Sequence, residues 1–277
     1  MFPGVKIDLA KHYILDRLCP SGGFCHYGLD EPNLHDTWHA LAGLRILGVR
    51  LDSGPTVRFL RSFQGRDGSF RSAAQAYYAL LGLEKLGAPP SHDPARCIAG
   101  LALAAAESFT RAQTPDAAKL EDTRRLVALQ RRYDVRIANR ENIAERIMLC
   151  RNGDGGFGSP ASSLTETLAA VEILHNLGLR ADAESAAHFV RSCDHPVAGF
   201  TDMPGTSLHY IEHVHAGLAL CLALRIQPGH ASACAASVRR CQLVNGGFAR
   251  ASLGIANLEY TYLALHSLQL LKDFKAK

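Results

Sequence analysis

Histidine pairs four residues apart are the part of this sequence best suited to metal chemistry. His35 precedes His39 by four residues, and His209 precedes His213 by the same interval. On a helix this spacing puts two imidazoles on one face, where both can bind one divalent ion. Residues 209–213 also match the His-x-x-Glu-His pattern of some zinc proteases. We reject protease activity, because this short match lies inside a longer repeat that explains it otherwise.

A glycine-rich turn that ends in phenylalanine recurs along the chain and sets its organisation. The repeat phenylalanines are Phe24, Phe70, Phe157, Phe200 and Phe248. They stand about 46 residues apart, except for one interval of about twice that length, which places an unrecognisable copy near residues 110–115. The sequence therefore predicts six stacked units, none of which can bury its apolar face without its neighbours.

Each unit is predicted to form a helix, a turn and a second helix. An Asx-Gly pair supplies the positive φ that ends the first helix, and the second helices carry fewer charges than the first ones. The second helices should therefore be buried as an inner layer, while the first ones face water. The expected helices of the first three units span residues 5–18, 37–49, 55–63, 72–86, 97–108 and 120–133. A polar connection is expected over residues 110–118.

Composition limits the kind of protein that this chain can be. Its 277 residues divide into six units of the observed length, which predicts one domain over residues 1–277. Hydrophobic residues make up 47% of the chain, enough for a sizeable core, and the net charge of +4 is too small to argue for nucleic acid. No apolar run is long enough to span a membrane and no signal-peptide pattern opens the chain, so we expect a soluble, cytoplasmic protein.

A second signature marks the start of each inner helix. Its middle residues are Asp36, Gln75, Asp122, Glu166, Glu212 and Tyr260. Because acids recur here, Asp36, Asp122, Glu166 and Glu212 are interpreted mainly as helix caps that offset the positive helix end.

Function is expected among the residues that do not repeat. In a closed ring the fifth, sixth and first units are consecutive. This would bring five side chains to one side of the mouth, which is the end of the ring where the inner helices start. The predicted metal ligands are His35, Asp36, His209, His213 and Glu259. The alternative is that these histidines only bind loop carbonyls.

Three of the eight cysteines, Cys150, Cys193 and Cys241, stand at the same place in the repeat, seven residues before its phenylalanine. A residue held in register packs against its neighbours, so we expect these three to be buried, unpaired thiols in a reducing compartment. No Cys-x-x-Cys pair argues for a structural zinc site.

The repeated Asp-Gly-Gly-Phe turns, each followed by an inner helix with an Asp-Thr start, resemble the prenyltransferase and terpene-cyclase repeat superfamily. The likeness is greatest to the β subunits of protein prenyltransferases and covers nearly the whole chain, being weakest over residues 89–145. It implies an all-α (α/α)6 toroid in which six inner helices surround an apolar funnel. Folds of this kind host several chemistries, so function has to be argued from the site.

The zinc site of that family does not carry over to this chain as it stands. The resemblance implies an Asp and a Cys nine and eleven residues after one repeat Phe, and a His twelve residues after the next. Here the matching positions hold His209, Ile211 and Tyr260 in one register, or Asn257, Glu259 and Asp36 in the next. Neither set contains a thiolate. Zinc or magnesium is therefore expected only through the histidine and carboxylate cluster.

The class II terpene cyclases of the same superfamily protonate an alkene with the middle acid of Asp-x-Asp-Asp-Thr. Glu121 is the only acid in that middle position here, and Lys119 should lower its pKa, which disfavours proton donation. Cyclisation is therefore ranked second. Asp36, Glu121 and Glu259 are the candidate catalytic acids.

The resemblance also implies a prenyl diphosphate or another isoprenoid lipid as the ligand. Arg71 and Arg250 follow repeat phenylalanines and are the candidates for diphosphate binding. Inner-helix aromatics that could line a tunnel for the prenyl chain are Trp38, Tyr77, Tyr78, Tyr260 and Tyr262. The chain is thus expected to be a prenyltransferase-type protein, alone, with a second subunit or as a homodimer. The remaining alternative is a non-catalytic toroid that binds a lipid or a protein.

Overall fold

The computed structural model describes residues 4–27, 29–111 and 117–275, and within them the chain is almost wholly helical. The predicted copy near residues 110–115 falls largely outside this description. The outer helices are α1 (Ile7–Leu15), α3 (Ser53–Arg61), α5 (Ala95–Arg111), α7 (Arg140–Met148), α9 (Ala183–Ser192) and α11 (Ala231–Arg240). The inner helices are α2 (Leu34–Ile46), α4 (Ala73–Lys85), α6 (Ala117–Arg132), α8 (Leu164–Asn176), α10 (Ile211–Leu224) and α12 (Leu258–Lys275).

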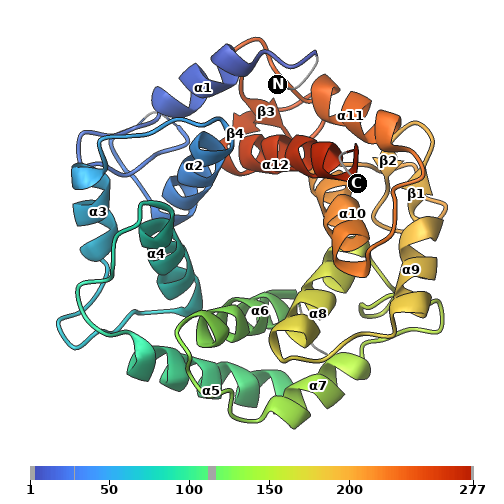
Figure 1. The fold of residues 1–277 in the computed structure, drawn as a ribbon, viewed down its shortest axis with the longest axis horizontal. Helices are drawn as coiled ribbons and strands as arrows, with labels where there is room; N and C mark the ends of the chain where they lie inside the picture. Colours follow the sequence, from blue (N-terminus) through green and yellow to red (C-terminus); the bar gives the residue numbers. More distant parts are fainter. Residues whose placement is uncertain (1–3, 28, 112–116, 276–277) are drawn as a thin grey trace.

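The helices form two concentric rings, as the repeat predicts (Figure 1). Neighbouring inner helices pack against each other, and α12 closes the ring by packing against α2. Helix α11, the last outer helix, lies beside α1 in the outer ring (Figure 1). The first and last units are therefore neighbours, which the expected convergence of residues at the mouth requires. No helix among the described residues is both long and apolar enough to cross a bilayer.

Two of the repeated turns carry short β-hairpins. Strand β1 (Asp194–His195) pairs antiparallel with β2 (Gly199–Phe200), and β3 (Phe248–Ala249) pairs antiparallel with β4 (Ala256–Asn257). In two other turns the flanking residues form isolated bridges, such as Arg151 with Phe157. All five repeat phenylalanines are buried.

A hydrogen bond from the turn to the inner helix explains why the two repeated signatures occur together. The backbone N–H of Phe157 donates to Thr167 Oγ1 over 2.9 Å, and that of Phe248 donates to Thr261 Oγ1 over 3.0 Å. Phe24 and Thr37 make the same bond over 2.9 Å. These threonines are fully buried, so each satisfies a backbone donor that would otherwise lose its hydrogen bond on folding.

Asp36, Glu166 and Glu212 do lie in the first turns of α2, α8 and α10, where they can offset the helix dipole, but they are not the N-cap residues, which corrects that part of the prediction. The cap is the residue three positions earlier, whose side chain accepts from the N–H of the signature residue. The pairs are Asn33 with Asp36, Ser72 with Gln75, Ser163 with Glu166, and Asn257 with Tyr260. Asp122 lies inside α6 and pairs with Arg125 instead. In the fifth unit α10 begins after Tyr210, so His213 and not Glu212 occupies the signature position.

In two of the turns, the glycine two residues before the repeat phenylalanine packs closely against the next outer helix. Gly155 has a φ of +87°, and a Cβ there would overlap the backbone of Ser185 at the start of α9. Gly246 has a φ of +90° and meets the backbone of Leu9 in α1 in the same way. The last turn thus packs on the first outer helix and closes the outer ring.

All eight cysteines are unpaired. Cys193 and Cys241 are buried as predicted, and burial raises the pKa of their thiols to about 12 and about 11. Cys150 is only half-buried, which corrects the prediction for that residue.

Candidate functional site

Three side chains that could bind one metal ion meet where α12 closes the ring against α2. One ligand atom from each of His35, His39 and Glu259 lies within 4.8 Å of the others. His35 and His39 stand one turn apart on α2, and Glu259 is the second residue of α12. The closure of the ring therefore assembles this group from residues more than 200 positions apart.

The two imidazoles are held in place by backbone and side-chain contacts. The Nδ1–H of His39 donates to the carbonyl of His35 over 2.8 Å, which leaves Nε2 as its free nitrogen. Burial, with the nearby His35, lowers the pKa of His39 to about 3, so this ring stays neutral. His35 lies with Nε2 3.7 Å from Glu259 Oε2 and with Nδ1 3.6 Å from Asp36 Oδ1.

The two carboxylates of this region titrate in opposite directions. Burial raises the pKa of Glu259, and the His35 charge offsets only part of that rise. Burial would also raise the pKa of Asp36, but hydrogen bonds from His35, Asn33 and the N–H of His26 outweigh it and lower the pKa. Asp36 is therefore an ionised residue that orients His35, whereas Glu259 is the carboxylate free to serve as a ligand.

This donor set fits a divalent metal. Two imidazoles and one glutamate form a ligand set of catalytic zinc sites, and a neutral imidazole is the form that binds metal. Among the described residues, His35 and Glu259 are the only two of the five predicted ligands in this group. Asp36 adjoins it through His35. His39, which the four-residue spacing indicated but which was not among the five predicted ligands, completes it.

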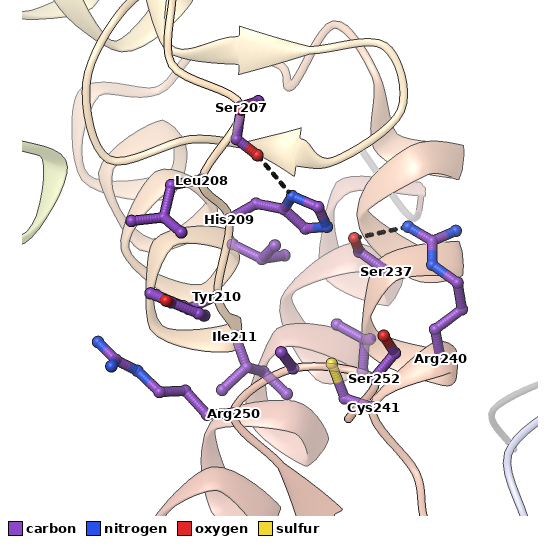
Figure 2. A pocket seen from close by; sticks show the side chains of 13 residues that line it. Ser207, Leu208, His209, Tyr210, Ile211, Ser237, Arg240, Cys241, Arg250 and Ser252 are labelled. Atoms are coloured by element: carbon purple, nitrogen blue, oxygen red, sulfur yellow. Dashed lines mark hydrogen bonds between the residues drawn. The ribbon is translucent and has the colours of Figure 1, made fainter. Parts of the chain in front are cut away.

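His209 and His213 lie elsewhere. His209 is not part of the cluster. It lines a cavity of about 190 Å³ between α10, α11 and the β3–β4 hairpin (Figure 2). Its Nδ1 is hydrogen-bonded to the carbonyl of Ser207. The buried His213 receives the N–H of Tyr210 at its Nδ1. The one-residue register shift of α10 turns this pair away from the position that the repeat predicted.

Aromatic side chains line one half of the ring centre. Trp38 lies 5.1 Å from Tyr262, 6.4 Å from Tyr77 and 5.9 Å from Tyr78 between ring centroids. These four residues come from α2, α4 and α12, and each is partly exposed on the inner face of its helix. They form a continuous aromatic wall. It adjoins the group of His35, His39 and Glu259, here called the metal-type cluster, since the ring centroids of His39 and Tyr262 are 5.6 Å apart.

Charged and polar side chains line the other half, which corrects the expectation of a wholly apolar funnel. Arg124 of α6 donates to both oxygens of Glu121 and, over 2.8 Å, to Glu172 of α8. His215 of α10 and His266 of α12 are joined by a hydrogen bond of 2.9 Å. Burial, with the His266 charge, lowers the pKa of His215 to about 3.

Of the remaining predicted residues, Arg71 lies at the surface and Arg250 is already paired. Arg71 is exposed at the turn before α4, where its N–H donates to Gln75. Arg250 binds Glu212 and stacks on the Tyr210 ring at 3.9 Å. Tyr260, the signature residue of α12, is half-buried near this pair and does not belong to the aromatic wall. The ion pair with Glu212 therefore already neutralises Arg250.

Comparison with known proteins agrees with this architecture. Residues 6–94 and 124–277 match the model of the prenyltransferase alpha-alpha toroid domain, and the chain belongs to that family. The gap in the match coincides with the degenerate third unit. A search of curated proteins finds no match.

Two solved structures show the same fold at low sequence identity. One is Candida albicans protein geranylgeranyltransferase-I in complex with GGPP, with a TM-score of 0.75 and 16% identity. The match covers 98% of this chain and 92% of that one. The other is a protein from Actinoplanes, with a TM-score of 0.57, 18% identity, and coverage of 96% and 98%.

Proposed function

We propose that this protein binds an isoprenoid along the aromatic wall of the ring centre and transfers it from a prenyl diphosphate. The continuous contact of Trp38, Tyr77, Tyr78 and Tyr262 is the observation that carries this proposal. Such a surface excludes water from a prenyl chain, and its ring faces stabilise positive charge that develops on the chain during transfer. The fold shared with a GGPP-bound transferase supports the same ligand class.

The Trp38 indole offers a polar contact in this apolar wall. Its buried Nε1–H has no acceptor among the described residues. A buried donor without a partner is unfavourable, so an oxygen of a bound diphosphate is a suitable acceptor. We propose that Trp38 contacts the ligand with both its ring and this N–H.

Three arginines that could neutralise a diphosphate are already paired, so a metal ion would add positive charge to the site. Arg124 and Arg125 bind Glu121, Asp122 and Glu172, and Arg250 binds Glu212. We propose that His35, His39 and Glu259 hold a divalent ion. When bound, such an ion neutralises diphosphate oxygens or polarises an acceptor. Asp36 would then keep His35 oriented.

A terpene-cyclase activity has weaker support. Burial raises the pKa of Glu121, but the hydrogen bonds of Arg124 and the charges of Arg124 and Arg125 outweigh it and lower that pKa. Glu121 therefore stays ionised and is a poor proton donor. These arginines, and not chiefly Lys119, cause the lowered pKa. Glu259, with its raised pKa, is the better acid of the predicted three.

Removing the indole should weaken isoprenoid binding. For Trp38→Ala we expect a Kd for farnesyl or geranylgeranyl diphosphate that is roughly 10- to 100-fold higher, because apolar contact area is lost. Titration calorimetry with each diphosphate measures this change. Tyr27→Ala is the control, since Tyr27 is an exposed aromatic residue that is not part of the aromatic wall. Failure of the wild type to bind either diphosphate, or an equal loss in both variants, would contradict the proposal.

Metal content separates the cluster from the neighbouring histidines. Purified wild-type protein loaded with zinc should retain about one equivalent after dialysis, and His39→Ala should lose it, because two ligands rarely suffice for a stable site. His209→Ala should keep the metal, since His209 lines a different cavity. Elemental analysis decides the matter. Metal retained in His39→Ala and lost in His209→Ala would restore the grouping predicted from the sequence.

A further inference from the structure

A second cavity lies at the opposite end of the inner helices from the metal-type cluster. It has a volume of about 550 Å³ and is bounded by the ends of α2 and α4 and the start of α3, which are neighbours in the ring (Figure 1). His35 is near the start of α2 and Arg45 near its end, so the two sites are roughly 15 Å apart along the helix. This cavity plays no part in the function proposed above.

The lining combines positive charge with apolar surface. Its cations are Arg45, Arg50 and Lys85. Its apolar side chains are Leu41, Leu44, Val49, Leu51 and Leu86. No carboxylate is part of the lining. A cavity of this composition accommodates an anion that carries an apolar group.

The acids next to this cavity in sequence are occupied elsewhere. Glu84, adjacent to Lys85, binds Arg132 over 2.9 Å, and Asp52, adjacent to Leu51, caps α3 by accepting from the N–H of Gly54. Within the described part of the chain, Arg45, Arg50 and Lys85 make no salt bridge. Their charges are therefore available to a ligand.

Helix dipoles explain only part of this positive charge. Basic residues commonly offset the negative ends of helices, and α2 and α4 both end here. Each helix end is equivalent to about half a negative charge, so two ends offset about one of three cations. Arg50 also lies beyond the end of α2. The helix ends therefore offset only part of the charge of these three cations.

The surroundings of Lys85 also indicate that the cavity would favour an anion. Burial and the positive charge of Arg45 lower its pKa, and Arg132 adds to this effect while Glu84 opposes it. An anion between these cations would relieve their mutual repulsion. Arginine side chains also present the forked donors that match phosphate oxygens.

We propose that this cavity binds a phosphate-bearing amphiphile, with the phosphate on Arg45, Arg50 and Lys85 and the apolar part against the leucines. The phosphate could belong to a lipid headgroup or to a free phosphate compound. The shared chemistry is a multiply charged phosphate. Binding at this end of the ring does not require activity at the mouth.

Calorimetric titration with two soluble probes tests the site. The probes are inorganic pyrophosphate and dioctanoyl phosphatidate, with dioctanoyl phosphatidylcholine as a ligand without net charge. For the Arg45→Gln, Lys85→Gln double variant we expect binding of the phosphate probes to weaken by about 10- to 100-fold, because charge-assisted hydrogen bonds are lost. The variant Arg66→Gln is the control, since Arg66 is exposed at a turn near the mouth. The control should bind like the wild type.

The two probes also distinguish the sources. Tighter binding of phosphatidate than of pyrophosphate assigns the site to a lipid phosphate. Equal binding would show that the apolar lining contributes nothing, which overturns the amphiphile and leaves a site for free phosphate compounds. The proposal is overturned if neither phosphate probe binds, if phosphatidylcholine binds as tightly as phosphatidate, or if the double variant binds as well as Arg66→Gln. Because Arg45 and Lys85 both reach the surface and only part of the Lys85 side chain is buried, the double variant is expected to fold, which its circular dichroism spectrum checks.

Discussion

Gly246→Ala is expected to destabilise the protein by about 2–5 kcal/mol. A Cβ at this position would overlap the backbone of Leu9 in α1, and the backbone φ of +90° is itself strained for alanine. The strained conformation costs about 1–2 kcal/mol and the overlap about 1–3 kcal/mol. Because natural domains are stable by only about 5–15 kcal/mol, this single methyl group removes a large part of the stability. Urea unfolding, followed by circular dichroism, measures the loss.

A matched glycine separates the two contributions. Gly205 has a φ of +73°, but a Cβ there would have no atom within 4 Å. Gly205→Ala should therefore cost only about 1–2 kcal/mol, from the strained backbone alone. Equal losses in both variants would show that the contact between the last turn and α1 contributes nothing to the closure of the ring.

The ring could be predicted from the sequence because its determinants repeat. Glycines at positive φ, buried phenylalanines and the residues at the start of the inner helices mark corresponding places in most units, and the structure explains these marks by local contacts. Phe157 with Thr167 is one example, because the bond recurs wherever both signatures are present. A constraint that occurs several times in one chain leaves a period that a single sequence reveals.

The site was harder to predict, because it depends on single residues and on register. Placing His213 in the cluster required α10 to start where the other inner helices start, and Tyr210 shifts that start by one residue. His39 carried a usable signal, its spacing of four residues from His35, but the same spacing occurs in the His209 pair. Only the observed start of α10 distinguishes the two pairs.

The charged half of the ring centre left no sequence signal of its own. Arg124 occupies the same place on α6 that Trp38 and Tyr262 occupy on α2 and α12, one residue after the signature threonine. Its contacts with Glu172 cross from one unit to the next, and cross-unit pairs of this kind do not repeat. The prediction of an apolar funnel followed from the family likeness, and these side chains limit the apolar surface to one half of the centre.

Arg124→Met should therefore have a large effect on stability. The arginine is the shared partner of Glu121 and Glu172, and its removal leaves two partly buried carboxylates close together. Breaking a buried ion pair by removing one partner costs about 3–5 kcal/mol. We expect a value near the low end, about 3 kcal/mol, because the Glu172 side chain is 39% exposed and water screens part of the charge. The control is Arg132→Met, whose partner Glu84 lies at the surface and which should cost about 1 kcal/mol or less.

The pH dependence of this loss is the sharper measurement. In the wild type the pKa of Glu121 is held below its usual value, so the resulting stability is present above about pH 4.5 and is lost as the pH falls through the lowered pKa. Without Arg124, burial acts on Glu121 against Arg125 alone, and the pKa rises relative to the wild type. Protonation at low pH then removes the uncompensated charge. The difference in unfolding free energy between the wild type and Arg124→Met should be largest at pH 7 and should shrink toward pH 4, whereas a difference that stays constant over this range would show that Arg124 acts by packing and not by charge.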